Sequence, residues 1–398
     1  MTDAKLLIFA YINSVAGGKS RRRVRRTWQA VRRCIESSGV PVQWHEYWTR
    51  RADDVPSEAE VMRYGRPCAV LAVGGDGTFQ QIARRVHGLE VPLAVVPLGT
   101  GNGIAASLGY RDVMDAARKI RVQLQHLRAE DTELAARAVG LRLDAIRYRL
   151  QTQAEAADER HITCWQRCRD CFRWRRPSRG AEQAVGQAAA EGVSNETSAL
   201  LPASQGWAYL SLTLGLVADL DIRTEVMRWL GPLRLDLGAP YYILRKRVFE
   251  ATIAYRSAEH RLDNDADGDA VQEVKQTRFV LAAVMNVTHA GAKAMLAPRA
   301  RCDDGCFDLV LAPSSVSRAR LFSLTTKLES GAHVNDPACI YLKCTWARIT
   351  LATPQLVSVD GEAVYDVREL ELHGGLATVP LLHAREGGEQ TAAPGRVL

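Results

Sequence analysis

Residues 73–79 read VGGDGTF, and residues 96–103 read VPLGTGNG. A short apolar run precedes each segment, and a helix-like pattern follows it, QQIARRV in the first case. Apolar runs of this length are typical of buried parallel strands, so each segment is predicted to be a turn from a strand into a helix. Because the carboxyl ends of neighbouring parallel strands meet at one edge of a sheet, we expect the two turns to form one cleft.

Glycine occupies much of both turns, and Gly74, Gly75 and Gly77 stand in the first. Glycine tolerates positive φ and lets backbone N–H groups come close to a ligand. The start of a helix favours anions, phosphate above all. The second turn repeats the design with Thr100, Gly101 and Asn102. The two turns therefore predict a phosphate cradle.

Asp76 is the one side chain with reactive chemistry inside the first turn. A carboxylate beside a phosphate repels it, unless the carboxylate binds a metal or removes a proton from an attacking group. Tight turns without a function would explain neither Asp76 nor the repeated design. We therefore predict that Asp76 is the base of a phosphoryl-transfer site and that Mg²⁺ lies near it.

The composition is that of a globular protein with two domains. The chain has 398 residues, 47% of them hydrophobic, so two ordinary cores can be buried. No long apolar run predicts a membrane-spanning helix, and the N-terminus lacks the pattern of a signal peptide. Nine unevenly spaced cysteines do not resemble a disulfide framework, so a cytoplasmic location is expected.

The charge indicates an anionic partner. A formal net charge of +7 suits nucleotide phosphates or an acidic membrane surface. It would also suit nucleic acid, but the sequence has no helix-turn-helix, zinc-finger or aromatic RNA-binding pattern, so no nucleic-acid partner is expected. The sequence does not determine the oligomeric state and leaves a homodimer open.

The order of the expected elements predicts an α/β domain followed by a β domain. Strands are expected at residues 5–13, 42–47 and 68–73, with helices between them. This alternation indicates a parallel, doubly wound sheet. From about residue 135, strand-like runs separated by loops favour a mainly antiparallel sandwich or open barrel. We place the first domain at residues 1–145 and the second at residues 146–388.

Residues 152–205 are predicted to form an inserted loop, which contains Cys164, Cys168 and Cys171. Aromatic residues and arginines lie between and around these cysteines. Metal binding, attachment to a lipid surface and an inert loop all fit this composition. Three cysteines lack a clear fourth ligand, which disfavours a zinc site. The sequence leaves the role of the loop open.

The first expected strand runs into NSVAGGKS, residues 13–20. GGKS resembles the end of a P-loop, but Asn13 replaces the first glycine that this motif requires, so we reject a P-loop. A phosphate-facing turn at residues 13–19 is still expected. The arginine-rich stretch that follows, at residues 21–26, fits a solvated helix face as well as a nucleotide or lipid contact.

A second group of charged residues lies beyond residue 207. Residues 207–222 are predicted to form a strand, so Asp219 and Asp221 would share one face. Arg228 and Arg234 follow, and arginines that reach a triphosphate would neutralise charge that moves in the transition state. The last members of the group, in a tight turn between strands, are Asp360, Gly361 and Glu362.

VGGDGTF and PLGTGN resemble the catalytic domain of the diacylglycerol kinase, ceramide kinase and sphingosine kinase superfamily. SLTLGLVADLDIRTEVMRWLGPLR, at residues 211–234, is similar to a segment peculiar to sphingosine kinases, and VSVDGE resembles part of their C-terminal half. The likeness covers about residues 5–145 and 206–385. It implies a nucleotide-binding α/β domain, a β-sandwich that encloses a lipid, and an active site between them.

The resemblance implies ATP-dependent phosphorylation, with Mg²⁺, of the primary hydroxyl of sphingosine or a related sphingoid base. It also implies visits to a membrane through basic and aromatic surface. Asp76 falls on the family's catalytic base, and Asp221 falls on the aspartate that receives the substrate amine. Gly75 and Gly77 of the cradle are expected to bind the nucleotide. The other positions expected to bind it are Asn13, Ser14, Val15, Thr49, Gly74, Thr100, Gly101, Asn102, Arg228, Arg234, Asp360, Gly361 and Glu362.

Three positions depart from the family's pattern. Ser14 stands where the family usually has proline, Gly74 replaces a serine in the central turn, and Gln81 replaces the glutamate five residues after the catalytic aspartate. If that glutamate helps to hold the metal or the ribose, activity would be lower here, although Gln81 still forms hydrogen bonds. Three other readings stay open: a diacylglycerol or ceramide kinase on the same scaffold, an NAD kinase-like enzyme, and a non-catalytic relative that binds lipid or nucleotide.

Overall fold

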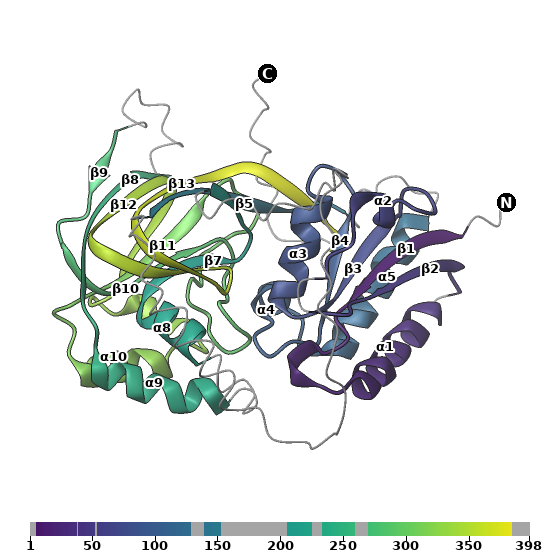
Figure 1. The fold of residues 1–398 in the computed structure, drawn as a ribbon, viewed down its shortest axis with the longest axis horizontal. Helices are drawn as coiled ribbons and strands as arrows, with labels where there is room; N and C mark the ends of the chain where they lie inside the picture. Colours follow the sequence, from purple (N-terminus) through teal and green to yellow (C-terminus); the bar gives the residue numbers. More distant parts are fainter. Residues whose placement is uncertain are drawn as a thin grey trace, which may run out of the picture.

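The structure is a computed structural model, and it describes residues 5–37, 39–51, 54–128, 139–152, 205–224, 233–258 and 270–383. Figure 1 shows an α/β part built from the N-terminal residues and a β-rich part built from the later ones, with the strand β13 (Glu362–Leu381) arching between them. No described helix combines the length and the apolar character needed to cross a bilayer.

The N-terminal part contains four parallel strands, in the order β2 (Val42–Trp48), β1 (Leu6–Ile12), β3 (Ala69–Gly74) and β4 (Leu93–Pro97). Every residue of β3 and β4 is buried. A parallel sheet covered by helices on both faces requires such uninterrupted apolar strands. The predicted doubly wound domain is therefore confirmed.

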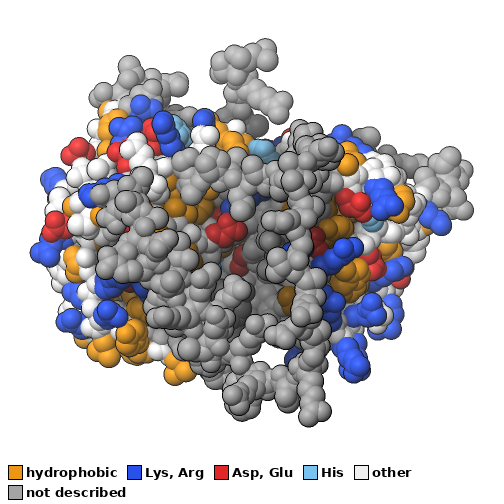
Figure 2. Space-filling model, in the orientation of Figure 1, with side chains coloured by type: hydrophobic (Ala, Val, Ile, Leu, Met, Phe, Trp, Pro, Cys, Tyr) orange, Lys and Arg blue, Asp and Glu red, His pale blue; other side chains and the backbone are white. Residues whose placement is uncertain are grey.

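Helices cover both faces of this sheet. The long helices α1 (Arg21–Glu36) and α5 (Val113–Arg128) pack over one face, where Trp28 and Ile120 join Ile8 and Leu71 in a single core cluster. On the other face lie the helices α2 (Glu58–Val61), α3 (Asp76–Val86) and α4 (Gly103–Ser107). Figure 2 shows basic side chains over the α1 side of the molecule, where the arginines of the first helical turns are exposed.

The C-terminal part is mainly antiparallel, as predicted. Its strands are β5 (Leu141–Thr152), β6 (Gln205–Ala208), β7 (Ser211–Gly215), β8 (Phe249–Ser257), β9 (Gln272–Glu273), β10 (Arg278–Met285), β11 (Phe307–Pro313), β12 (Ile340–Val359) and β13. Apolar side chains of these strands, such as Leu212 of β7, Phe279 of β10 and Leu370 of β13, form one buried core. The helices α8 (Leu216–Arg223), α9 (Leu233–Arg245) and α10 (Arg318–Thr326) lie outside this core.

The two parts share a continuous sheet. The last residues of β13 pair in parallel with β4, at Leu381 and Leu93, and pair antiparallel with the start of β5. The predicted boundary between residues 145 and 146 falls inside β5, and the division of the chain at that point stays a prediction. The three cysteines of the predicted insertion, Cys164, Cys168 and Cys171, lie outside the described residues.

The prediction of one strand over residues 207–222 is wrong. The structure has β6 and β7 there, and the chain then enters the helix α8. Gly215 causes the break, because its φ of 68° lies in the left-handed region and a Cβ atom at this position would collide with the carbonyl oxygen of Val280. Asp219 and Asp221 therefore lie on a helix, where residues two apart point in different directions.

Candidate active site

The two glycine-rich turns pack directly against each other, as predicted. A Cβ atom on Gly99, in the turn after β4, would collide with the Cα of Gly75, in the turn after β3. A Cβ atom on Gly74 would collide with the side chain of Thr78 in the next helical turn. Glycine is thus needed here for close approach. The left-handed residue in these turns is Asn102, with a φ of 53°.

Asp76 is the first residue of α3, and its carboxylate points at the start of α4. One oxygen accepts a hydrogen bond from the backbone N–H of Gly103 at 2.9 Å, and the other from that of Ile104 at 3.0 Å. Burial raises the pKa of Asp76, these two hydrogen bonds lower it, and the nearby Asp221 carboxylate raises it again. The net effect is a raised pKa on a carboxylate that is held in a fixed orientation.

The ends of β1 and β2 meet the same edge of the sheet. The side-chain amide of Asn13 donates to Thr78 Oγ1 at 3.1 Å, which links the first turn to α3. The backbone N–H of Ser14 donates to the hydroxyl of Thr49 at 3.1 Å. Val15, next in the chain, is 51% exposed. The structure therefore brings the predicted residues of the first turn, Thr49 and both glycine turns to one edge, although whether they bind a nucleotide stays a prediction.

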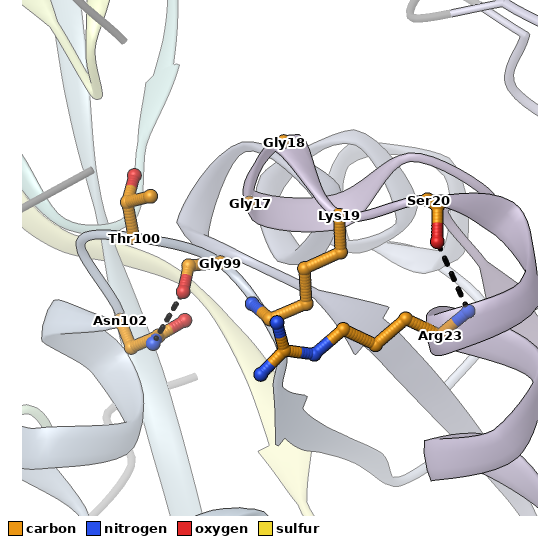
Figure 3. A pocket seen from close by; sticks show the side chains of 8 residues that line it. All are labelled: Gly17, Gly18, Lys19, Ser20, Arg23, Gly99, Thr100 and Asn102. Carbon is orange, nitrogen blue, oxygen red and sulfur yellow. Dashed lines mark hydrogen bonds between the residues drawn. The ribbon is translucent and has the colours of Figure 1, made fainter. Parts of the chain in front are cut away.

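A cavity of about 580 Å³ opens between the first turn and the turn after β4 (Figure 3). Thr100 and Asn102 line it, together with six residues that the predicted nucleotide-binding positions did not include: Gly17, Gly18, Lys19, Ser20, Arg23 and Gly99. Gly17, Gly18 and Lys19 belong to the phosphate-facing turn that was expected at residues 13–19. Burial and the neighbouring Arg23 lower the pKa of Lys19, whose ammonium donates to the carbonyl oxygen of Leu98 at 2.6 Å. The signal for these residues was present in GGKS, in the arginine run and in the second glycine-rich turn.

The cavity suits an anion for three reasons. Two cationic side chains, Lys19 and Arg23, extend along its wall in Figure 3. The N-terminus of α1 begins at its rim, where Ser20 accepts a hydrogen bond from the backbone N–H of Arg23. The first turn of α1 carries arginines and no acidic residue, although cations are unfavourable at a helix N-terminus. A bound anion would offset that cost.

Asp221 lies on α8, on the side of the helix that faces β12. Its carboxylate accepts a hydrogen bond from Ser358 Oγ at 3.0 Å, and it lies close to Gly361. Asp219, two residues earlier, is bound instead by Arg223 at 2.6 Å and by Arg247 at 3.4 Å. The expectation that the two aspartates share a face is therefore wrong, and only Asp221 is directed toward the turn after β12.

Asp360 and Gly361 form the two-residue turn between β12 and β13, both with positive φ. The Asp360 side chain is fully buried, and its oxygens accept hydrogen bonds from the backbone N–H groups of Tyr209, Leu210 and Ser211 at 2.8–2.9 Å. Burial raises the pKa of Asp360 to about 6, against the opposing effects of Arg84 and of these hydrogen bonds. The carboxylate thus ties this turn to the start of β7.

Arg84 is a residue of this region that the sequence analysis missed. It lies on α3, and its guanidinium is 3.8 Å from Asp360 and 3.4 Å from Glu362. Glu362 is mostly exposed, so Arg84 bridges a buried carboxylate and a surface one. The only sequence signal was its position two helical turns after Asp76. The predicted nucleotide contacts of Asp360, Gly361 and Glu362 stay predictions.

Comparison with protein families matches two models. Residues 6–132 match the diacylglycerol kinase catalytic domain. Residues 222–371 match the C-terminal domain of YegS, described as an NAD kinase beta sandwich-like domain. Together the two matches cover both parts of the fold in the order in which these parts occur in the chain.

The chain therefore carries a diacylglycerol kinase-type catalytic domain followed by a YegS-type C-terminal domain. Sphingosine kinase 1 of Arabidopsis thaliana is 23% identical over 372 residues, a match that covers 85% of this chain and 62% of that protein. Human sphingosine kinase 1 is 27% identical over 179 residues, which cover 40% of this chain and 45% of that protein. These matches thus span 62% and 45% of the length of the two relatives, less than two thirds of either.

A solved structure of a putative diacylglycerol kinase from Bacillus anthracis has a TM-score of 0.55 and 16% identity, and the match covers 94% of this chain and 97% of that one. Such a likeness shows the fold, an α/β domain followed by a β-sandwich. The matched diacylglycerol kinase catalytic domain covers the part of the chain that contains both glycine-rich turns and Asp76.

The pair of arginines expected to neutralise the triphosphate is not tested by the structure. Arg228 lies outside the described residues, and Arg234 lies on α9, in a turn whose side chains are not described. Gln81 accepts a hydrogen bond from the hydroxyl of Tyr11 at 2.9 Å, so it connects α3 to β1. A glutamate in its place could accept the same hydrogen bond, so this contact does not explain the substitution.

The donor set fits a magnesium ion bound mainly by phosphate and water. The described residues contain no group of three or more acidic, histidine or cysteine side chains that could hold a metal ion. Mg²⁺ in kinases is usually held by one or two carboxylates, several waters and the substrate phosphates. The oxygens of Asp76 accept backbone hydrogen bonds from Gly103 and Ile104, and a carboxylate has about four lone-pair sites, so this carboxylate meets that requirement.

Proposed function

We propose that the protein is a lipid kinase that transfers the γ-phosphoryl group of ATP to the primary hydroxyl of sphingosine or a related sphingoid base. The observation that supports it is the pair Asp76 and Asp221. One carboxylate lies at the glycine cradle, and the other lies close enough to raise the pKa of the first. The pair offers one group to the reacting hydroxyl and a second to a cation on the same substrate.

Asp76 would act as the general base. Its raised pKa brings a carboxylate closer to the pH at which the enzyme works, which makes it a better proton acceptor. The hydrogen bonds from Gly103 and Ile104 fix the direction of both oxygens. Asp76 would therefore receive the proton of the acceptor hydroxyl as the oxygen attacks the γ-phosphorus.

Asp221 would bind the protonated amine of the base. A partly buried carboxylate is costly unless a cation or hydrogen-bond donors accompany it, and Ser358 supplies one donor. A sphingoid base carries an ammonium group near its primary hydroxyl, whereas diacylglycerol and ceramide carry no such charge. This difference favours the sphingoid base over the other lipid acceptors.

The phosphates of ATP would lie along the glycine turns. Lys19, Arg23 and the helix N-terminus at the rim of the large cavity supply positive potential for them. Mg²⁺, when bound near Asp76, would neutralise charge that develops on the phosphoryl oxygens. The close packing of Gly75 on Gly99 leaves the backbone of both turns unobstructed by side chains.

The test compares four acceptors with labelled ATP: sphingosine, N-acetylsphingosine, ceramide and diacylglycerol. We expect turnover with sphingosine and a large loss with N-acetylsphingosine, which differs by the charge of the amine. Asp221→Asn should raise KM for sphingosine about tenfold or more, because it removes a charged hydrogen-bond partner, while KM for ATP stays near the wild-type value. Equal turnover of the charged and acetylated bases would overturn the amine contact and favour a ceramide or diacylglycerol kinase.

The enzyme would reach its lipid at a membrane surface. Leu237, Tyr241 and Leu244, on α9, are each more than half exposed, and Phe322 of α10 is 51% exposed. Arg318, one turn before Phe322, donates to the carbonyl oxygen of Leu244 at 2.8 Å, so these residues form one surface, and orange side chains gather over α9 and α10 in Figure 2. An apolar face with adjacent arginines is typical of helices that lie on anionic membranes.

Vesicle sedimentation tests this membrane contact. Leu237→Ser combined with Leu244→Ser should reduce binding to phosphatidylserine vesicles and leave turnover of detergent-dispersed sphingosine unchanged. Val122→Ser on α5, which replaces an exposed apolar residue outside this surface, is the control. Unchanged vesicle binding by the double variant would contradict the assignment.

A further inference from the structure

The hydroxyl of Thr213 is a buried polar group without a hydrogen-bond partner in the described part of the chain. Thr213 lies in the middle of β7 and is 3% exposed. Its Oγ1 has no donor or acceptor within reach. Buried hydroxyls in proteins are almost always hydrogen-bonded, because burial without a partner costs free energy. A threonine here, where valine would fill the same space, indicates that something outside the protein pairs with it.

Thr213 lies on the face of β7 opposite the sandwich core. Its neighbours Leu212 and Leu214 pack into that core, and side chains alternate along a strand. Directly across the antiparallel ladder, Thr213 faces Ser358 of β12 on one side and Ala283 of β10 on the other. Opposite residues of such a ladder point to the same face, with Cβ atoms about 5 Å apart.

Ser358 connects this hydroxyl to the acceptor site. Its own hydroxyl donates to Asp221, so the face that carries Ser358 and Thr213 is the face that Asp221 approaches from α8. Three polar groups therefore gather on this face of the sheet: the Asp221 carboxylate, the Ser358 hydroxyl that is bonded to it, and the Thr213 hydroxyl, which has no partner among the described residues.

We infer that Thr213 is a specificity-determining residue, which binds a second hydroxyl of the acceptor, one or two carbons beyond the amine. The inference rests on the proposed function, because Asp221 sets the position of the amine. A hydroxyl on a carbon near that amine would supply the hydrogen-bond partner that Thr213 Oγ1 lacks among the described residues. The preferred substrates are then long-chain bases that carry a hydroxyl beyond the amino alcohol, and bases without one bind less well.

The test measures kcat/KM for three acceptors of equal chain length. These are 2-amino-octadecan-1-ol, which has no further hydroxyl, sphinganine, which has one, and phytosphingosine, which has two. Wild-type enzyme should prefer one or both hydroxylated bases over the first compound. Thr213→Val keeps the shape and removes the hydroxyl, so it should lower kcat/KM for the preferred bases about tenfold and leave that for 2-amino-octadecan-1-ol unchanged.

Two further variants separate recognition from a structural role. Thr213→Ser keeps the hydroxyl and should retain the wild-type preference. Ser358→Ala acts through Asp221, so it should lower kcat/KM for all three amines by a similar factor. Thermal unfolding of each variant shows whether the fold is intact.

The outcomes are distinguishable. If Thr213→Val changes all three acceptors equally, or none of them, the hydroxyl contact is overturned while the proposed kinase activity stands. If wild-type enzyme phosphorylates none of the three bases, the proposed function and the hydroxyl contact both fail. A selective loss in Thr213→Val that Thr213→Ser does not show would support the inference.

Discussion

Two turns of the molecule carry the same dipeptide, Asp-Gly, and use it in opposite ways. Asp76 begins α3 at the glycine cradle, and Asp360 begins the turn between β12 and β13. Both carboxylates accept backbone hydrogen bonds from another segment, and burial raises the pKa of both. The residue Asp76 is partly exposed, whereas the side chain of Asp360 is fully buried and accepts three hydrogen bonds.

The difference teaches how a carboxylate is kept available for chemistry. Asp76 accepts hydrogen bonds from Gly103 and Ile104 that orient it, and its carboxylate keeps lone-pair sites for a further partner. Asp360 instead accepts hydrogen bonds from three backbone N–H groups of the chain itself, and these bonds hold the start of β7 against the turn after β12. We therefore expect substitutions of Asp76 to act mainly on turnover and those of Asp360 mainly on stability.

The largest effect is expected for Asp76→Asn. The amide has nearly the same shape, but it cannot accept the proton of the acceptor, so kcat should fall about 10³-fold, within the range measured for general bases. Binding of ATP, measured by calorimetry, should stay near the wild-type value. Turnover retained within a few-fold would show that Asp76 is not the base.

Asp360→Ala should have the largest effect on stability. It leaves three buried N–H groups without their acceptor, so the free energy of unfolding in urea should drop by about 4 kcal/mol. The fraction that folds at low temperature should keep turnover within about a hundredfold of wild type, the loss that a misplacement of about 1 Å by a distant substitution can cause. A stable variant without turnover would assign Asp360 to the chemistry and break the comparison.

Much of the fold could be predicted from the sequence, for a physical reason. The uninterrupted apolar runs of β3 and β4 are needed only by strands buried on both faces. The apolar run at residues 207–222 was misleading, because its pattern fits a buried strand and a buried helix equally well. One glycine, Gly215, decides between them through a backbone angle that the sequence alone does not display.

The site could be predicted where its residues lie in consecutive turns of one sheet edge. Gly75, Asp76 and Gly99 meet because parallel strands end together. Contacts across the two parts of the fold could not be predicted in this way. Arg84 and Asp360 are 276 positions apart, and nothing in either local sequence indicates that α3 faces the turn after β12.

Arg84→Ala measures how much this contact between the two parts contributes. Removal of the guanidinium leaves Asp360 buried beside its amide donors but without a cation, so we expect a loss of about 2 kcal/mol in the free energy of unfolding. Arg85→Ala is the matched control, because no ion pair of Arg85 occurs among the described residues, and it should change stability by about 0.5 kcal/mol or less. Equal effects of the two substitutions would show that the ion pair contributes nothing.

The smallest effect is a dependence of stability on pH that Asp360 contributes. Its pKa in the folded protein is about 6, above the ordinary value of 3.8, so between these values the folded state binds a proton that the unfolded state does not. Stability from this group is therefore greatest at low pH and is lost as pH rises through 6.

Between pH 5 and pH 7, the free energy of unfolding of wild-type protein should fall by about 1 kcal/mol relative to that of Asp360→Asn, whose side chain does not titrate. Other titrating groups are common to both proteins and cancel in this difference. If Arg84 and the three amides instead held the pKa below 3.8, the difference would be constant over this range, and Asp360 would be a permanently charged anchor, unlike Asp76.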